Sequence, residues 1–172
     1  MVLKRLVDTG LKLKPSKCRL LQRRIVFLGH VVTEDGVSTD PAKTEQIKKW
    51  PRPASFREVR GFLGLCGYYR KFIDRYAELA APLTSMLKKG HKFCWTDEGE
   101  VAFEKLKAVL TSPPILAMPK DEGLFILDTD ASDLSIGAVL SQVQDGQERV
   151  IAYAAKVLQP AQRNYCVTRR EL

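Results

Sequence analysis

The sequence has few of the side chains that bind soft metal ions or cross-link small secreted proteins. Its 172 residues include four cysteines and two histidines. The cysteines are widely spaced and form no Cys-x-x-Cys pair, which argues against a zinc site. Because the sequence also shows no export signal, we expect all four to be buried thiols in a reducing compartment: Cys18, Cys66, Cys94 and Cys166.

Long apolar runs are also missing. No run approaches the ~20 residues that a membrane-spanning helix needs, and the N-terminus has no apolar core like that of a signal peptide. With 45% hydrophobic residues, the composition is that of a globular protein rather than a disordered one. The sequence therefore predicts a globular protein with no membrane partner.

The net charge of +8 is unevenly distributed. Residues 1–90 contain 19 Lys and Arg against 8 Asp and Glu, whereas residues 91–172 contain 9 against 12. The two halves thus carry net charges of +11 and −3. A basic first half favours a polyanionic partner, because neutralised phosphates release counterions. An acidic second half suits a metal site. Ordinary solvated lysines are the alternative explanation for the basic half.

Residues 1–39 show a helix followed by strand signals. Over residues 1–14, apolar side chains share one side of a helix that Gly10 stops. Residues 18–21 and 25–33 have strand character. The turn residues 34–36 then lead into a returning strand that begins at Val37.

Two helices are predicted next, each with a recognisable start. Asp40 is a good N-cap before Pro41 at the first helical position, and this helix is expected to run through Trp50. Ser55, with Glu58 three residues later, has the spacing of a capping box and starts the second helix.

Two more helices and a linker complete residues 40–123. Residues 79–87 form a short helix with Pro82 near its start. Residues 112–123, rich in Pro and Gly, are the best linker candidate. Between residues 87 and 112, a second, amphipathic helix begins at Thr96 and runs through residue 110. Its inner face is made of Val101, Phe103, Leu106 and Leu110.

From residue 124 the apolar periodicity changes from 3.6 to 2, which predicts strands. They span 124–130, 135–143 and 148–155, and Asp145-Gly146 supplies a hairpin turn between the last two. Pro160 and Thr168 then announce a helix. The predicted fold class is α+β.

The first of these strands runs directly into acidic residues. Asp128 and Asp130 share one face of the strand, and Asp133 follows. Ionised carboxylates are costly to bury without partners, so a metal ion or another cation is the natural companion. A strand that simply ends in an Asx-type turn is the alternative.

Three glycines interrupt the helix that starts at Ser55. Gly61, Gly64 and Gly67 each cost roughly 1 kcal/mol relative to alanine, so their presence requires a reason. Either another helix packs closely against them, or a nucleic-acid backbone runs along that face. The second explanation is favoured by the flanking basic residues Arg57, Arg60, Arg70 and Lys71.

Several motifs in the same order resemble one family, the reverse transcriptases of gypsy-type LTR retrotransposons. TDASD (129–133) and GAVLSQ (137–142) are similar to the start of their RNase H domain, and NYCVTRREL (164–172) to the helix that follows. Upstream, the end of the polymerase palm and the thumb are resembled by LKLKPSKC (11–18), VFLGH (26–30) and GFLGLCGYYR (61–70).

The resemblance covers essentially the whole chain and implies its organisation. It implies a palm-end β-hairpin, a helical thumb and then a truncated RNase H-like sheet of three antiparallel strands with the start of a helix. The corresponding parts are a C-terminal palm remnant with the primer grip (1–39), thumb or connection helices (40–111), a linker (112–123) and the N-terminal part of an RNase H-like domain (124–172).

The resemblance also implies the roles of individual residues. Asp130 and Glu171 match two carboxylates that hold catalytic Mg²⁺ in the RNase H family, which uses a two-metal mechanism. We expect the two carboxylates to approach each other. For Glu171 the alternative is a capping box with Thr168.

The implied nucleic-acid contacts lie in the first half. Residues Phe27, Leu28, Gly29 and His30 match the primer grip, a hairpin that holds the primer terminus, and a plain buried hairpin is the alternative. The thumb helix with Gly64 and Gly67 would track the minor groove of the template–primer duplex.

By resemblance, the parent enzyme copies RNA into DNA and degrades the RNA of the hybrid, with Mg²⁺ in both reactions. Its partners are RNA–DNA hybrid or template–primer duplex and the remainder of the Pol polyprotein. We expect the protein inside the cell, in the cytoplasm, as part of a retroelement particle. The YxDD-type aspartates and the later RNase H ligands would lie outside these residues, so we expect weak or no Mg²⁺ binding and no activity from this chain alone. A non-catalytic connection-type binding module, or a decayed or domesticated element, is the alternative.

Overall fold

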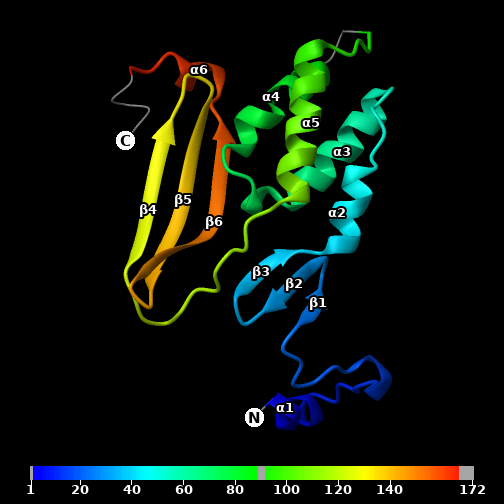
Figure 1. Cartoon of the computed structure of the whole chain (residues 1–172), viewed down its shortest axis with the longest axis vertical. Helices are drawn as coiled ribbons and strands as arrows, with labels where there is room; N and C mark the ends of the chain where they lie inside the picture. The colour runs from blue at the N-terminus through cyan, green and yellow to red at the C-terminus, as the bar shows by residue number, and fades with distance from the viewer. Residues whose placement is uncertain (1, 89–91, 167–172) are drawn as a thin grey trace.

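The computed structural model describes residues 2–88 and 92–166 and shows an α+β fold with two antiparallel sheets (Figure 1). Sheet A contains β1 (Ile25–Phe27), β2 (His30–Thr33) and β3 (Gly36–Thr39). Sheet B contains β4 (Phe125–Ala131), β5 (Ser135–Gln144) and β6 (Gln147–Val157). A group of helices lies beside sheet B and above sheet A in Figure 1.

The N-terminal segment lies apart from the core. Helix α1 (Val2–Asp8) ends before Gly10, as predicted, and its side chains are exposed or half-buried. The predicted strand over residues 18–21 is wrong. A 3-10 turn, η1 (Pro15–Lys17), is followed by irregular chain, in which Leu21 adopts a left-handed conformation with φ +56°. That conformation breaks an extended strand.

The predicted helix starts are confirmed for α2 (Pro41–Lys48) and α3 (Phe56–Tyr68). The amide of Ala42 donates to the Asp40 carboxylate at 3.0 Å, and the amide of Glu58 donates to the Ser55 hydroxyl at 3.3 Å. Helix α2 ends at Lys48, two residues before the predicted end at Trp50. The segment that follows begins with Pro51, before which a helical conformation is disfavoured.

The later helices differ from prediction in two details. Helix α4 (Tyr76–Met86) starts three residues earlier than expected, so Pro82 lies inside it. Helix α5 (Asp97–Thr111) begins at the predicted Thr96 cap, whose hydroxyl accepts from the Gly99 amide at 3.1 Å. Val101 was placed on its inner face but is 54% exposed, and Ala102 is buried instead.

The apolar core lies among these helices and the segment that follows α5. Side chains from α3, α4 and α5 meet there, and η2 (Arg70–Phe72) contributes Phe72. The aromatic rings of Phe62 and Phe103 have centroids 4.6 Å apart at its centre. From sheet B, half-buried Val150 and Tyr153 pack against the same core.

Sheet B confirms the predicted strands and hairpin. Asp145 and Gly146, at φ +53° and +77°, form the two-residue turn between β5 and β6. The β5–β6 pairing is irregular between Leu140 and Ser141, which marks a bulge. Helix α6 (Pro160–Arg163) follows, starting at the predicted Pro160. Thr168 and Glu171 lie outside the described residues.

The segment predicted to be a linker is tied to both sheets. Leu116 and Val37 of β3 exchange two backbone hydrogen bonds, at 2.7 and 2.9 Å, and the amide of Ala117 donates to Val150 of β6 at 2.8 Å. Gly36 makes the first contact possible. Its φ is +139°, and a Cβ there would lie 2.2 Å from the Leu116 carbonyl oxygen.

Further along the same segment, a buried amide holds the backbone. The Gln142 side chain is completely buried; its oxygen accepts from the Lys120 amide at 2.9 Å, and its nitrogen donates to the carbonyls of Lys120 and Glu122 at 2.9 and 3.0 Å. Gln144 donates to the Met118 carbonyl at 2.8 Å. This set of contacts, which we call the glutamine clamp, shields backbone groups that would otherwise need water.

The cysteine prediction holds for one residue only. Cys66 is buried in the core, where desolvation raises its pKa to about 12, whereas Cys18, Cys94 and Cys166 are exposed. Among the described residues, no helix has the length and apolar character needed to cross a membrane.

We predict that Gln142→Ala destabilises the protein by about 3 kcal/mol, because it removes three hydrogen bonds that this buried side chain makes to the backbone of Lys120 and Glu122. Chemical denaturation would measure the free energy of unfolding. Gln147→Ala, an exposed glutamine at the start of β6, is the matched control and should change it little. Equal effects of the two substitutions would contradict the clamp.

Candidate nucleic-acid interface and metal site

The turn between β1 and β2 is fixed by two tyrosines. Leu28 and Gly29, at φ +48° and +72°, make a two-residue hairpin turn. The Tyr68 hydroxyl donates to the Leu28 carbonyl, and the Tyr69 hydroxyl donates to the Gly29 carbonyl at 3.0 Å. The hairpin is therefore docked on the C-terminal end of α3, and any rearrangement of the turn has to break these contacts.

The tip of this hairpin is exposed. Phe27 is 61% and Leu28 69% exposed, so the alternative of a plain buried hairpin does not describe it. Two features favour glycine at position 29. Its φ is left-handed, and a Cβ there would lie only 3.0 Å from the Tyr69 hydroxyl. The turn thus presents a narrow, apolar surface with a fixed backbone.

His30 is packed beneath the turn rather than projecting from it. Its ring is parallel to that of Tyr68 with centroids 5.4 Å apart, and 5.5 Å from that of Phe72. Its Nδ1 is buried without a hydrogen-bond partner. Burial, and to a smaller extent the charge of Lys71, lower the pKa of His30. His30 therefore supports the hairpin as a neutral side chain at neutral pH.

The glycine-bearing side of α3 is open. Gly61 and Gly64 are exposed, and a Cβ at either would meet no atom within 4 Å. Within the described residues, close packing of another helix therefore does not explain why Gly61 and Gly64 are glycines. Gly67 differs, because its Cβ would lie 3.6 Å from the Tyr76 hydroxyl.

The basic residues predicted to flank this face are mostly free to reach a ligand. Arg57 and Arg60 are exposed and lie one turn before Gly61 and Gly64. Arg70 is exposed in η2, whereas Lys71 is half-buried with its amine 5.1 Å from the centre of the Phe72 ring. We call the surface formed by Arg57, Arg60, Gly61 and Gly64 the α3 face.

A hollow connects the hairpin with α2 and α3. Its volume is about 340 Å³, and Leu28, Gly29 and Tyr68 contribute to its wall. Lys43 and Gln46 of α2 and Trp50 line the other side. Aromatic rings, a cation and an amide are the groups with which proteins contact bases and phosphates.

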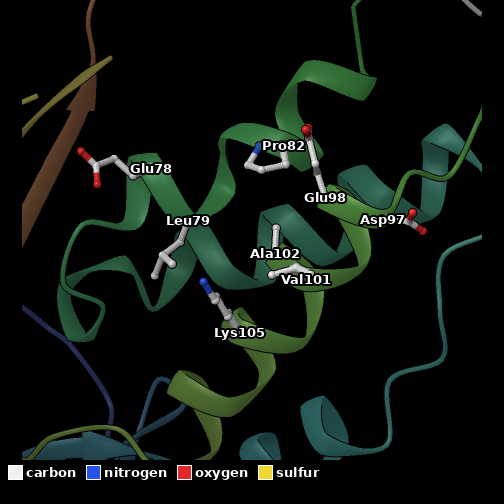
Figure 2. Close-up of a pocket in the computed structure, with 8 residues that line it drawn as sticks. All are labelled: Glu78, Leu79, Pro82, Asp97, Glu98, Val101, Ala102 and Lys105. Carbon is white, nitrogen blue, oxygen red and sulfur yellow. The ribbon is translucent and has the colours of Figure 1, made fainter. Parts of the chain in front are cut away.

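A second hollow, of about 400 Å³, separates α4 from α5 (Figure 2). Its wall is mainly apolar, with Leu79 and Pro82 on α4 facing Val101 and Ala102 on α5. It explains why Val101 is exposed. The carboxylates of Asp97 and Glu98 belong to its rim, so this hollow has the wrong charge for a phosphate backbone.

Asp130 lies near the end of β4 and has an ionic partner that the sequence did not suggest. Its carboxylate accepts from the Arg75 guanidinium at 2.6 Å, across 55 residues of sequence. The Asp130 side chain is 65% exposed and the Arg75 side chain 57%. Glu171 lies outside the described residues, so the expected approach of the two carboxylates stays a prediction.

The described residues do not form a magnesium cage by themselves. Carboxylate oxygens such as those of Asp128 and Asp130 are suitable ligands for Mg²⁺. However, no group of three or more His, Cys, Asp or Glu side chains able to hold a metal ion occurs within residues 2–88 and 92–166. A cationic side chain already contacts Asp130.

Two further contacts next to Asp130 were missed by sequence reasoning. Ser135 is buried, and its hydroxyl donates to the Glu78 carboxylate at 3.0 Å. Hydrogen bonding from Ser132 is the main cause of a lowered pKa at Glu78, helped by Ser135 and the charge of Arg75. No local motif connects α4 with the β4–β5 turn, so pattern reading had no signal for this contact.

Comparison with known families and proteins gives consistent matches. Residues 95–172 match the family model of the RNase H-like domain found in reverse transcriptase. The chain is 45% identical over 174 aligned positions to the Pol polyprotein of transposon 297 from Drosophila melanogaster, covering 100% of this chain and 16% of that protein. It is 34% identical to the transposon Tf2-3 polyprotein of Schizosaccharomyces pombe, covering 99% and 13%. The chain thus spans less than a fifth of the length of these relatives.

Solved structures with the same fold come from foamy virus. The protease-reverse transcriptase dRH in complex with double-stranded DNA superposes with a TM-score of 0.83 and 24% identity, over 99% of this chain and 30% of that one. The protease-reverse transcriptase in complex with RNA/DNA hybrid gives 0.82 and 23%, over 99% and 23%. At these identities, the likeness shows the fold.

We predict that acidification destabilises the protein through His30. Because its pKa is lowered from 6.5 in the folded state, the unfolded chain binds more protons between the two values. Stability should therefore fall as the pH drops through and below about 6.5. Thermal unfolding between pH 7.5 and 5 would measure this, and His30→Phe should flatten the His30-dependent part. An unchanged pH profile in that variant would contradict the assignment.

Proposed function

We propose that this chain binds the template–primer or RNA–DNA hybrid duplex of a gypsy-type element. The chain belongs to the retrotransposon Pol polyprotein family, and its residues 95–172 match the RNase H-like domain found in reverse transcriptase. In the intact parent protein, this segment would connect RNA-directed DNA synthesis with cleavage of the RNA strand. The proposed partners are the duplex and the remainder of the polyprotein.

The observation that carries the proposal is the open α3 face. Two helix-interior glycines are exposed, and a Cβ at either would meet no atom of the described residues within 4 Å outside its own helix turn. Two exposed arginines lie a turn away. Glycine costs helix stability, so an open glycine face is best explained by a ligand that approaches the backbone closely. A phosphate–sugar backbone fits this requirement, because the arginines can neutralise its charge.

The fixed hairpin and the charge distribution support the same ligand. The docked turn at Leu28 and Gly29 adjoins the C-terminal end of α3, so hairpin and helix offer one continuous surface. The net +11 of residues 1–90 would attract a polyanion to it. We assign the primer-grip role to residues 27–30 as part of the proposal.

The proposed chemistry of the parent is hybrid cleavage with Mg²⁺. Asp130 and Glu171 would supply two of the carboxylates that hold the ions, and the metal would polarise the scissile phosphate and activate water. Within this chain, Asp130 would position the ion at the end of β4. Because the described residues provide no complete ligand group, we expect the isolated chain to bind duplex without cleaving it.

A non-catalytic binding module is the second candidate. The ion pair between Arg75 and Asp130 favours it, because the proposed metal ligand already has a cationic partner. In that case Asp130 would serve only to hold α4 on sheet B.

We predict that the chain binds duplex with an affinity that falls steeply with salt, and that Gly64→Leu weakens binding several-fold without loss of stability. Leucine should even stabilise α3 by about 1 kcal/mol, since glycine is the poorer helix former and a Cβ at residue 64 meets no atom within 4 Å among the described residues. Electrophoretic mobility shifts at 50 to 200 mM salt would measure affinity, and thermal unfolding would measure stability.

Ala108→Leu is the matched control for this experiment. Ala108 is an exposed small residue on α5, so the same enlargement there should leave binding unchanged. If both variants bind duplex as tightly as the unsubstituted chain, or if binding is insensitive to salt, the α3 face is not the duplex surface.

We predict no cleavage when the chain is incubated with RNA–DNA hybrid and Mg²⁺. A labelled hybrid followed on a denaturing gel provides the measurement, with an intact reverse transcriptase as the positive control. Metal-dependent cleavage that disappears in Asp130→Asn would refute inactivity and favour the catalytic candidate over the binding module.

A further inference from the structure

A third hollow, of about 570 Å³, lies beside the first strand of sheet A. Its wall is made by the irregular chain that precedes β1 and by the three residues of β1 itself. Figure 1 shows this part of the chain below sheet A, on the way from α1 to β1. We call this space, lined by residues 17–27, the β1 hollow.

The charges around the β1 hollow have one sign. Lys17, Arg19 and Arg24 line it, and all three are exposed. Within the described residues, none of these side chains forms an ion pair with a carboxylate. Residues 9–33 contain six Lys and Arg and no Asp or Glu, so the neighbouring chain supplies no counter-charge either. The hollow therefore suits an anionic ligand.

A turn in the chain brings the cations to the same hollow. Leu21 has φ +56°, a left-handed conformation that reverses the course of an extended chain. Arg19 and Arg24 lie on either side of this turn, and both border the hollow. Gln22, which also lines it, offers an amide that can both donate to and accept from a base.

The remaining wall of the hollow is apolar. Ile25, Val26 and Phe27 of β1 are all exposed, and β1 pairs with β2 alone among the described strands, so its outer edge is open. An apolar wall offers nothing to a duplex, whose bases are stacked inside it. It does suit an unpaired base, which can stack on an aromatic ring while cations hold the adjacent phosphates.

We propose that the β1 hollow binds an unpaired nucleic-acid strand, the single-stranded end that continues from the duplex on the α3 face. This inference rests on the proposed function and adds a second binding surface to it. Phe27 links the two surfaces, because it lines the hollow and directly precedes the hairpin turn at Leu28 and Gly29. The turn then marks the border between the paired and the unpaired part of the ligand.

Binding of labelled oligothymidine to the whole chain, followed by fluorescence anisotropy at 50 to 200 mM salt, tests the hollow without a duplex. The double variant Arg19→Gln/Arg24→Gln should bind it about tenfold more weakly. The slope of log affinity against log salt should fall by about 1.4, because each phosphate contact on a single strand contributes about 0.7. Thermal unfolding should be unchanged, since both side chains are exposed.

Lys48→Gln/Lys105→Gln is the matched control. It removes the same charge from exposed positions on α2 and α5, outside the β1 hollow and the α3 face. Its affinity for oligothymidine should stay within about twofold of that of the unsubstituted chain, because distant exposed charges are screened by salt. Gly64→Leu, which is expected to weaken duplex binding, should leave oligothymidine binding unchanged.

Duplexes with and without a single-stranded extension test the link between the two surfaces. The unsubstituted chain should bind a duplex with a 5′ or a 3′ extension more tightly than the blunt duplex, and Arg19→Gln/Arg24→Gln should lose that gain. Three results would each overturn the proposal: no binding of oligothymidine, equal losses in the two double variants, or equal affinity for the blunt duplex and both extended ones. Gly64→Leu tests the α3 face on blunt duplex, so failure of the hollow and failure of the proposed function give different results.

Discussion

The backbone of residues 116–123 crosses from the helical core to sheet B, and its peptide groups need partners along the way. The glutamine clamp supplies them from β5, while Leu116 and Ala117 pair with β3 and β6. A polar side chain is stable inside a protein when its hydrogen bonds are satisfied, and Gln142 uses both its amide oxygen and its nitrogen. The placement of sheet B, and with it the position of Asp130, depends on this set of bonds.

Local chemistry explains which features could be predicted from the sequence. The caps at Asp40, Ser55 and Thr96 act within four residues, so their motifs specify helix starts directly. The hairpin at Asp145-Gly146 is equally local. Residues 18–21 were misassigned because their apolar character suggested a strand, whereas a strand also requires a neighbour to pair with. Val101 was misplaced because the hollow beside it forms between two helices, which helical periodicity does not describe.

The same distinction between local and tertiary interactions applies to the candidate site. The glycines of α3 could be singled out because glycine in a helix is costly in itself, and their open face agrees with the ligand explanation. Asp130 was singled out by its motif, but its partner Arg75 comes from another element 55 residues earlier. Contacts of this kind arise from tertiary packing, and the same is true of Tyr68 and Tyr69 on the hairpin turn. Sequence patterns therefore identified the hairpin residues, the α3 glycines and Asp130, but they did not identify the side chains from other elements that contact the hairpin and Asp130.

The buried residues of the main core have a consequence for the order in which the protein forms during synthesis. All fourteen lie between Ile47 and Leu116, so the core can close as soon as the ribosome has released the chain up to that point. Sheet B is made afterwards, as hairpins of neighbouring strands, and docks through Val150 and Tyr153 onto a surface that already exists. The helical core thus provides the surface on which sheet B packs, and Leu116, in the segment that joins the helices to the sheet, is the last of its buried residues to be synthesised.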